Sequence, residues 1–578
     1  MRPPFLQRVW GADRARPVWP FRFRWADLLI VAGLAGLLYG LLKFGRQTAE
    51  LRPHVEIDLS PLALPYYTFL SLSRGLFAYC LSLAFTLVYG YWAAKDARAR
   101  RVLLPLLDVL QSIPVLGFMP GVLLALVATF PGSNFGLELT AIIMIFTGQA
   151  WNMTFSFYQS VTSVPQDLRE AATLFHFRWW QLFRRVELPF ATIGLVWNSM
   201  MSMAGGWFFL AVCESIELGD SKFQLPGIGS YMTSAVDAGR VDAMLWAILA
   251  MTLMIVALDQ LLWRPVVVWA QKYSVEDTAN TEIATSWFLN WLRRSRLLAL
   301  AGHGYRRILP ERAQRAPVSD AAAERRTFQL PNWLDVVPLA FLVGALAYGG
   351  WRLVGMVSQV SIAQWEELIG AGGWTLGRVL VAIVIGTLWT VPVGLAIGLS
   401  PRLARLAQPV VQVVASFPAP MLFPLVTAGL TAAGITLNWG SIVLMLLGTQ
   451  WYILFNVIAG AMAVPADLRE AAAAYRLEGW QRLRLLYLPA VFPYLVTGWV
   501  TAAGGAWNAS IVSEYLKYKN ETLSATGLGY VIRDAAERKD FTLLAAGVMV
   551  MSIIVVLFNR AVWRRCYRLA ETRFALNR

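Results

Sequence analysis

The sequence predicts an all-α polytopic membrane protein made of two parallel six-helix repeats, with about 12 transmembrane helices. Hydrophobic residues make up 57% of the 578-residue chain, charged residues make up only 15%, and the mean hydropathy is +0.53. Soluble globular proteins usually contain about 25% charged residues. Several windows of about 20 residues are nearly free of charge and long enough to cross roughly 30 Å of hydrocarbon. These values argue against a large soluble helical protein.

A segment that occurs twice predicts the two repeats. Val164–Ala172 reads VPQDLREAA, and Val464–Ala472, which begins 300 residues later, reads VPADLREAA. Each copy is followed by Leu-Pro, at 188–189 and 488–489. A Ser-x-Pro triplet also recurs, at 112–114 and 416–418, with a spacing of 304 that implies an indel of about four residues. The 300-residue spacing further relates Gly148 to Gly448, Trp151 to Trp451, Glu214 to Glu514, Gly227 to Gly527 and Gly229 to Gly529.

Charges between the apolar windows predict the orientation of the spans. Lys and Arg cluster at 95–101 and 178–185, whereas 131–134 carries neither, and positive loops stay in the cytoplasm. Both termini are therefore expected there. An even number of spans in each half makes the repeats parallel, related by a pseudo-two-fold axis along the membrane normal. The predicted spans are roughly 26–42, 68–92, 103–129, 137–162, 189–213, 243–268, 333–355, 374–399, 408–430, 439–463, 489–513 and 541–562.

The chain is expected to have four parts. An Arg-rich arm (1–25) lies on the cytoplasmic lipid surface, and a linker (270–330) separates the first repeat (26–269) from the second (331–578). Within the linker, 287–298 is apolar on one side and basic on the other, which predicts an interfacial helix. The formal charge of +15 is spread over short loops rather than one basic face, so nucleic acid is not an expected partner. Three cysteines and three histidines, all far apart in sequence, predict neither disulfides nor a metal site.

The repeated segment is predicted to be a short charged helix at the cytoplasmic face. Its proline can occupy the first turn, where no backbone N–H is needed, and its acidic residues then lie near the positive helix N-terminus. The paired alanines favour a helix and leave room for another surface to approach. We expect the contacts to a soluble partner to come from Asp167, Arg169, Glu170, Ala171 and Ala172 in the first copy, and from Asp467, Arg469, Glu470, Ala471 and Ala472 in the second.

Glu-Ala-Ala followed by a variable stretch that ends in Leu-Pro resembles the EAA loop of binding-protein-dependent ABC importer permeases of the type I fold. Both halves of the chain show this resemblance, so the chain resembles a fusion of two permeases. The Ser-x-Pro triplets and the segments that run from Glu214 and Glu514 to Gly-x-Gly resemble the nitrate/sulfonate/taurine/bicarbonate branch. One position departs from the pattern: His176 and Arg476 stand where the family usually has Gly. This departure leaves two alternatives, namely a different bend in the loop or specialised partner contacts.

The resemblance implies partners outside this chain. Two cytoplasmic ATP-binding subunits would receive the EAA loops, and an extracytoplasmic binding protein would deliver the substrate to a multi-pass permease of the bacterial inner membrane. ATP and Mg²⁺ would be bound by the ATPase subunits and no cofactor by this chain, which lacks a Gly-x-x-x-x-Gly-Lys-[Ser/Thr] phosphate loop. The chain is thus expected to be a transport subunit and not an enzyme.

Polar residues within spans are costly, and they are the candidates for the substrate pathway. Because this set contains no Lys or Arg, it suits a small polar solute or a weakly held oxyanion. For Glu214 and Glu514, interhelical hydrogen bonding is an equally good interpretation. The candidates are Gln111, Ser112, Gln149, Trp151, Asn152, Asn198, Glu214, Ser416, Gln450, Trp451, Trp507, Asn508 and Glu514.

A secondary transporter with two six-helix parallel repeats is the main alternative. It would share the hydropathy profile of this chain, but it needs no ATPase and leaves the paired EAA loops unexplained. Uptake that depends on an ion gradient rather than on ATP would distinguish it.

Overall fold

The structure is a computed structural model that describes residues 45, 48, 56–218, 221–273, 286–292, 332–518 and 521–574. Contacts divide the chain into two compact units, Met1–Leu42 with Thr285–Ala323, and Lys43–Ala284 with Glu324–Arg578. Of the first unit only 286–292 is described, where helix α13 (Trp287–Leu292) covers the start of the predicted interfacial helix. The predicted N-terminal arm and first span lie outside the described residues. The second unit contains the described parts of both repeats.

The described part of the first repeat is helical apart from one β-hairpin, β1 (Ser215–Leu218) with β2 (Ser221–Gln224). Short π-helical turns precede α9 and follow α11, at Phe183–Glu187 and Asp259–Trp263. The helices are α3 (Leu64–Lys95), α4 (Ala97–Ser112), α5 (Val115–Thr129), α6 (Phe135–Thr162), α7 (Gln166–Leu174), α8 (Trp179–Leu182), α9 (Leu188–Cys213), α10 (Ile228–Asp237), α11 (Val241–Leu258) and α12 (Arg264–Ala270).

The second repeat follows the same order, and from α20 onward most of its elements match the first at a spacing of 300 residues. Its hairpin pairs β3 (Tyr515–Tyr518) with β4 (Glu521–Ser524). Its helices are α15 (Asn332–Val357), α16 (Ile362–Leu399), α17 (Pro401–Ser416), α18 (Phe423–Ala432), α19 (Leu437–Met462), α20 (Ala466–Ala474), α21 (Gly479–Arg482), α22 (Leu488–Ser513), α23 (Leu528–Glu537), α24 (Phe541–Phe558) and α25 (Arg564–Arg573).

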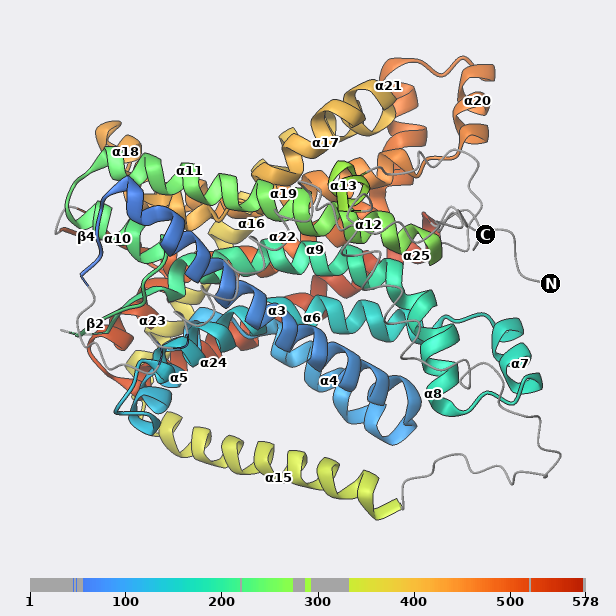
Figure 1. Ribbon diagram of the computed structural model, residues 1–578. Coiled ribbons are helices and arrows are strands. Elements are labelled where there is room, and N and C mark those ends of the chain that lie inside the picture. Colours follow the sequence, from blue (N-terminus) through green and yellow to red (C-terminus); the bar gives the residue numbers. More distant parts are fainter. Residues whose placement is uncertain are drawn as a thin grey trace, which may run out of the picture. The chain divides into compact units, whose positions relative to one another are not determined.

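Contacts between the repeats are reciprocal, as a two-fold axis requires. Within each repeat the middle long helix packs between two others, α6 between α3 and α9, and α19 between α16 and α22. Across the repeats α4 contacts α24 while its counterpart α17 contacts α11, and α5 contacts α22 while the turn at Ala419–Met421 contacts α9. Both β-hairpins lie at one end of the long helices, and α7 and α20 lie at the other (Figure 1). This arrangement agrees with the predicted parallel repeats.

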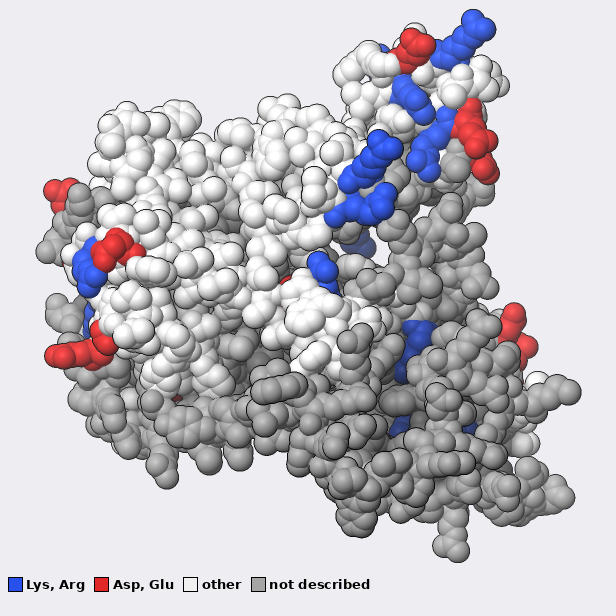
Figure 2. Space-filling view, turned by 45° about the horizontal axis from the view of Figure 1, so that its top comes forward, with Lys and Arg blue, Asp and Glu red and all other residues white. Residues whose placement is uncertain are grey.

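Among the described residues, eight helices are long and apolar enough to cross a membrane, or up to nine if the bent pair α4–α5 is one span. Charged side chains on the face in Figure 2 gather toward its two ends, with a largely uncharged band between them. The polytopic all-α class is therefore confirmed.

The third predicted span of each repeat is wrong as a single helix. α4 and α5 meet at an angle of 97°, and α17 is separated from α18 by a short turn. Ile113 and Phe417 precede prolines and adopt extended backbone, with ψ of 123° and 130°. Proline disfavours the helical conformation of the preceding residue, so each helix ends at the Ser-x-Pro triplet.

Candidate functional site

Each EAA segment folds as a helix closed by a left-handed residue. At the end of α7 the His176 N–H donates to the Thr173 carbonyl and the Phe177 N–H to the Ala172 carbonyl, both at 3.0 Å. These two bonds form a Schellman motif, whose residue after the C-cap is usually glycine because its φ is positive. His176 and Arg476 both adopt φ 51° there. The bend that glycine would provide is therefore kept, although neither residue is glycine.

The predicted docking residues divide into an exposed set and a buried set. The Glu170 carboxylate is exposed, and within the described part of the chain its one hydrogen bond comes from Gln166 on the same helix, at 2.8 Å. Arg169 instead donates to the Val161 carbonyl at 2.9 Å, which ties α7 to the end of α6. Ala172 is 5% exposed and packs inside its loop. In both copies the Glu is exposed and the second Ala is buried.

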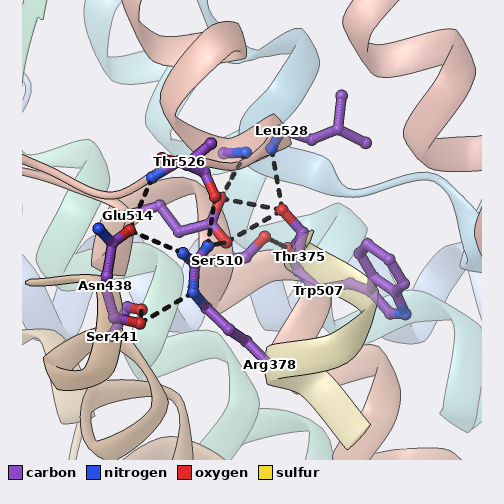
Figure 3. Close-up of polar contacts among 10 residues, drawn as sticks. Thr375, Arg378, Asn438, Ser441, Trp507, Ser510, Glu514, Thr526 and Leu528 are labelled. Atoms are coloured by element: carbon purple, nitrogen blue, oxygen red, sulfur yellow. Dashed lines mark hydrogen bonds and ion pairs between the residues drawn. The ribbon is translucent and has the colours of Figure 1, made fainter. Parts of the chain in front are cut away.

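At the hairpin end of the second repeat, Glu514 lies in a buried polar cluster (Figure 3). Arg378 donates to its carboxylate at 2.9 Å and Thr375 donates at 3.0 Å, both from α16. The Gly529 N–H at the start of α23 donates at 2.8 Å, where the positive end of a helix favours a carboxylate. Arg378 also donates to the Asn438 side chain at 2.9 Å. The cluster therefore joins α16, α19, α22 and α23.

The first repeat builds the same cluster with one more charge. Arg74 donates to Glu214 at 2.7 Å and to Glu138 at 2.6 Å, while Ser71 and the Gly229 N–H donate to Glu214 at 2.6 and 2.7 Å. Arg74 and Glu214 are fully buried. Two carboxylates thus share one guanidinium here, whereas the position equivalent to Glu138 in the second repeat is an asparagine.

A cavity of about 190 Å³ lies between the repeats at the hairpin end. Both hairpins, α10 and α23 contribute to its wall, and the prolines of the bent segments, Pro120 and Pro424, also line it. Most of the wall is apolar. Its charged residues are Glu217, Asp237, Lys517 and Arg533.

Glu217 and Lys517 occupy equivalent positions of the two repeats and meet each other. The Lys517 ammonium donates to the Glu217 carboxylate at 3.0 Å. Equivalent residues touch only close to a two-fold axis, so this pair marks the pseudo-axis at the cavity. Partial burial raises the pKa of Glu217, but the hydrogen bond and charge of Lys517 outweigh it, with Lys222 and Arg533 adding to the effect, so the pKa lies below the usual value. The Glu217 carboxylate is therefore ionised at neutral pH, where the ion pair links the two repeats.

The family described as "binding-protein-dependent transport system inner membrane component" matches residues 86–262 and, a second time, residues 382–564. Together the two matches cover more than half of the chain. The chain belongs to this family. Because the match occurs twice, the polypeptide is a fused double permease, a multi-pass inner-membrane transport subunit and not an enzyme.

Relatives with named transport roles match this chain over no more than the length of one repeat. The taurine transport system permease protein TauC of Escherichia coli is 26% identical over 204 residues, 35% of this chain and 69% of TauC. The nitrate import permease protein NrtB of Synechococcus elongatus is 27% identical over 161 residues, 28% of this chain and 54% of NrtB. The bicarbonate transport system permease protein CmpB of Synechocystis is 24% identical over 199 residues, 34% of this chain and 66% of CmpB. These relatives agree with the branch that the motifs indicate.

In the first repeat of the double permease, two predicted pathway residues lie in helix packing. The Gln149 amide is fully buried and accepts a hydrogen bond from Ser82 at 3.3 Å. Asn198 donates to the Ser156 hydroxyl at 2.9 Å. Both contacts join α6 to its neighbours, so these amides stabilise the bundle in this structure.

The predicted tryptophans also pack against aromatic neighbours. Trp151 lies edge-on to Phe85, and Trp451 lies edge-on to Trp389, with ring centroids 6.0 Å apart in both pairs. Trp389 in addition donates its indole N–H to Gln450 at 3.0 Å. In both repeats this position therefore connects the middle helix to the long helix that precedes the bent segment.

Two predicted residues of the second repeat lie at contacts between the repeats. Asn508 accepts a hydrogen bond from the Val115 N–H, at the start of α5, at 2.8 Å. Ser416 lines a smaller cavity of about 20 Å³ next to Gln412, which donates to Asp259 across the repeats at 2.9 Å. These polar contacts stabilise the junction of the two repeats.

None of the predicted pathway residues whose side chains are described lines the larger cavity, and their role in passage stays a prediction. Glu214 and Glu514 form the interhelical hydrogen bonds that are their alternative interpretation. Among the described residues, no group of three or more His, Cys, Asp or Glu side chains could hold a metal ion. Gln111 and Asn152 are exposed, Trp507 is buried, and only the backbone of Ser112 is described.

Sequence reasoning missed the charged residues of the cavity. Glu217, Asp237, Lys517 and Arg533 lie outside the apolar windows, where charge carries no signal of function. One signal was available: equivalent positions 217 and 517 carry opposite charges, which is unusual in a repeat related by a two-fold axis.

Proposed function

We propose that this double permease forms the membrane pathway of an ATP-driven importer for a small polar solute or oxyanion. Two separate subunits that bind ATP and Mg²⁺ dock on the EAA loops in the cytoplasm, where both termini of the permease also lie. An extracytoplasmic binding protein delivers the solute to the hairpin end. The names of the relatives support this class, because taurine, nitrate and bicarbonate are all small and carry an anionic group.

The observation that carries the proposal is the pair of EAA loops at one end of the bundle. Large apolar side chains stand out from these otherwise charged segments: Leu174 is 80% exposed, Phe175 74%, Tyr475 81% and Trp480 68%. Exposed apolar patches with polar surroundings mark contacts with other proteins. Two such patches in equivalent positions suit two copies of one partner.

The geometry supplies a way to couple the two ends. α9 has 26 residues and runs from the first docking loop to Glu214, a length of about 39 Å at 1.5 Å per residue. α22 does the same in the second repeat. When ATP draws the two ATPases together, the docking loops approach each other and the repeats rock about the pseudo-axis near the Glu217–Lys517 pair. The cavity at the hairpin end then opens to the binding protein, and hydrolysis resets the transporter.

The first test is a mild detergent extraction of the complex from its native membrane, with the stoichiometry of every co-purifying chain. Two ATPase subunits per permease are expected. Reversing the charge of both docking loops (Glu170→Lys with Glu470→Lys) should then uncouple ATP hydrolysis from uptake in liposomes. The matched control reverses two carboxylates outside the docking loops, Glu366→Lys with Glu367→Lys near the start of α16, and should keep the ATPases bound.

Fully coupled uptake by the docking-loop variant would refute this role for the EAA loops. A preparation without ATPases even after cross-linking, together with uptake driven by an ion gradient, would instead indicate a secondary transporter.

A further inference from the structure

Among the described residues, three of the four charged groups of the larger cavity have an ion-pair partner. Asp237 accepts a hydrogen bond from Lys222, and Lys517 bridges Glu217 and Glu537, with the second contact at 3.1 Å. The fourth charged group of the wall, Arg533 on α23, makes no ion pair or hydrogen bond with another described residue. Its side chain is half-buried, and its charge reaches Glu217 only at a distance. Arg533 therefore has donors to offer a ligand.

We propose that Arg533 binds the anionic group of a small organic anion, a sulfonate or carboxylate, whose apolar part lies against the wall of the cavity. This inference rests on the proposed function and names the substrate class of the pathway. A guanidinium presents five N–H donors in a fork that matches two oxygens of one anion, and such charge-assisted pairs are among the strong hydrogen bonds.

The wall of the cavity favours an organic anion over an inorganic one. Met119, Met421, Phe423 and Ile511 are among the apolar residues that surround the charged groups. Small-molecule sites are typically apolar with a few placed polar groups that orient the ligand. Nitrate or bicarbonate would satisfy Arg533 but would leave the apolar wall in contact with water. An anion with a short alkyl chain pairs with Arg533 through its charged group and covers the apolar wall with its chain.

The cavity is also asymmetric, which orients the ligand. Thr233 occupies the position of the first repeat that is equivalent to Arg533, and it lines the same cavity. Its hydroxyl donates to the Gly229 carbonyl at 3.1 Å. Of the two cationic groups in the wall, Lys517 pairs with Glu217 and Glu537, whereas Arg533 pairs with no described carboxylate. One anion therefore binds with its charged end toward Arg533 of the second repeat.

The test measures binding to the full chain in lipid nanodiscs by ligand-dependent thermal stabilisation. The probes are propane-1-sulfonate and butanoate, compared with nitrate, bicarbonate and uncharged butan-1-ol at equal ionic strength. The organic anions should stabilise the wild type at lower concentration than the other three. Arg533→Gln should weaken their binding by about tenfold or more, because it removes a charge-assisted pair of hydrogen bonds. The affinity of Arg533→Lys for the organic anions should lie between those of the wild type and Arg533→Gln.

The matched control is Arg538→Gln, which removes an equal charge just after the same helix. Arg538 is exposed, pairs with Asp534 at 3.0 Å and does not line the cavity, so binding should stay as in the wild type. Equal binding of propane-1-sulfonate by wild type and Arg533→Gln would overturn the assignment of Arg533. Equal stabilisation by nitrate and propane-1-sulfonate would overturn the organic class.

These outcomes are separable from failure of the proposed function. Co-purification of ATPases reports on the importer role and does not depend on Arg533. If ATPases co-purify and Arg533→Gln binds like the wild type, only the inference fails. If no ATPase co-purifies, the importer role fails whatever the anions do.

Discussion

Among the charged residues at the hairpin end, replacement of Arg74 should lower the free energy of unfolding the most. Replacing Arg74 by Met keeps an unbranched side chain but removes the guanidinium that neutralises Glu138 and Glu214. Both ion pairs are short, 2.6 and 2.7 Å, and the three side chains are between 0% and 4% exposed. Removing one partner of a buried ion pair costs about 3–5 kcal/mol, because the other charge is left without compensation. Here two carboxylates are left.

The second repeat provides an internal comparison. Arg378→Met leaves one carboxylate, Glu514, because Asn438 replaces the second glutamate. The loss of stability should therefore be larger for Arg74→Met than for Arg378→Met. Adding Glu138→Asn to Arg74→Met removes the extra carboxylate and copies the arrangement of the second repeat. This double variant should recover part of the lost stability and resemble Arg378→Met.

The assay is thermal unfolding of the full chain in nanodiscs, read as the fraction that stays monodisperse after heating. For a chain of 578 residues, a cost of about 3–5 kcal/mol corresponds to a Tm lower by about 2–4 degrees, because the shift equals the lost free energy divided by the entropy of unfolding. Glu138→Asn alone serves as the control and should be closer to the wild type than Arg74→Met, since Arg74 keeps Glu214 as its partner. The reasoning is refuted if Arg74→Met unfolds at the wild-type temperature, or if Glu138→Asn brings no recovery to it.

Three other contacts can be tested by single substitutions. Glu217→Gln should cost about 0.2–1 kcal/mol at pH 7, as partly exposed ion pairs do. Lys517 lowers the folded-state pKa of Glu217 below its ordinary 4.5, so the contribution of the pair to stability is present above pH 4.5 and is lost as the pH falls through the lowered pKa. The Tm difference between wild type and variant should therefore shrink as the pH is lowered below 4.5. His176 and Arg476 adopt the left-handed conformation, which costs a residue other than glycine about 1–2 kcal/mol. His176→Gly and Arg476→Gly remove this cost, so backbone hydrogen exchange in the EAA loops should slow. His176→Val increases the cost and should speed the exchange. Gly229→Ala places a Cβ 2.6 Å from the Ala211 carbonyl oxygen and should lower Tm. Gly121→Ala places its Cβ in open space and should leave Tm unchanged. Equal Tm values for the two variants would contradict the close approach of α10 to α9.

Local patterns were enough to predict the fold class and the repeat. Hydropathy predicted twelve spans, and eight of them coincide with described helices that are long and apolar enough to cross a membrane. Hydropathy can do this because a bilayer requires continuous apolar helices whatever the tertiary contacts are. The EAA segments at Glu170 and Glu470 also follow from the sequence, since a proline, acidic first-turn residues and alanines specify a short helix by themselves. The helix breaks at Pro114 and Pro418 also have a local cause, the proline itself. They were missed because both prolines lie inside windows that are apolar enough to be predicted as single spans.

Only the tertiary structure decided which polar residues act together. Arg74 and Glu214 are 140 residues apart, and Glu217 and Lys517 are 300 apart, so no local pattern links them. The pseudo-two-fold axis brings positions 217 and 517 into contact, and the bend before α5 brings Pro120 to the same cavity as Arg533. Polar residues in the spans, such as Gln149, were the natural candidates for the pathway, yet helix packing uses their hydrogen bonds. The physical reason is that burial of a polar group demands a partner, and which partner it finds depends on how the helices pack.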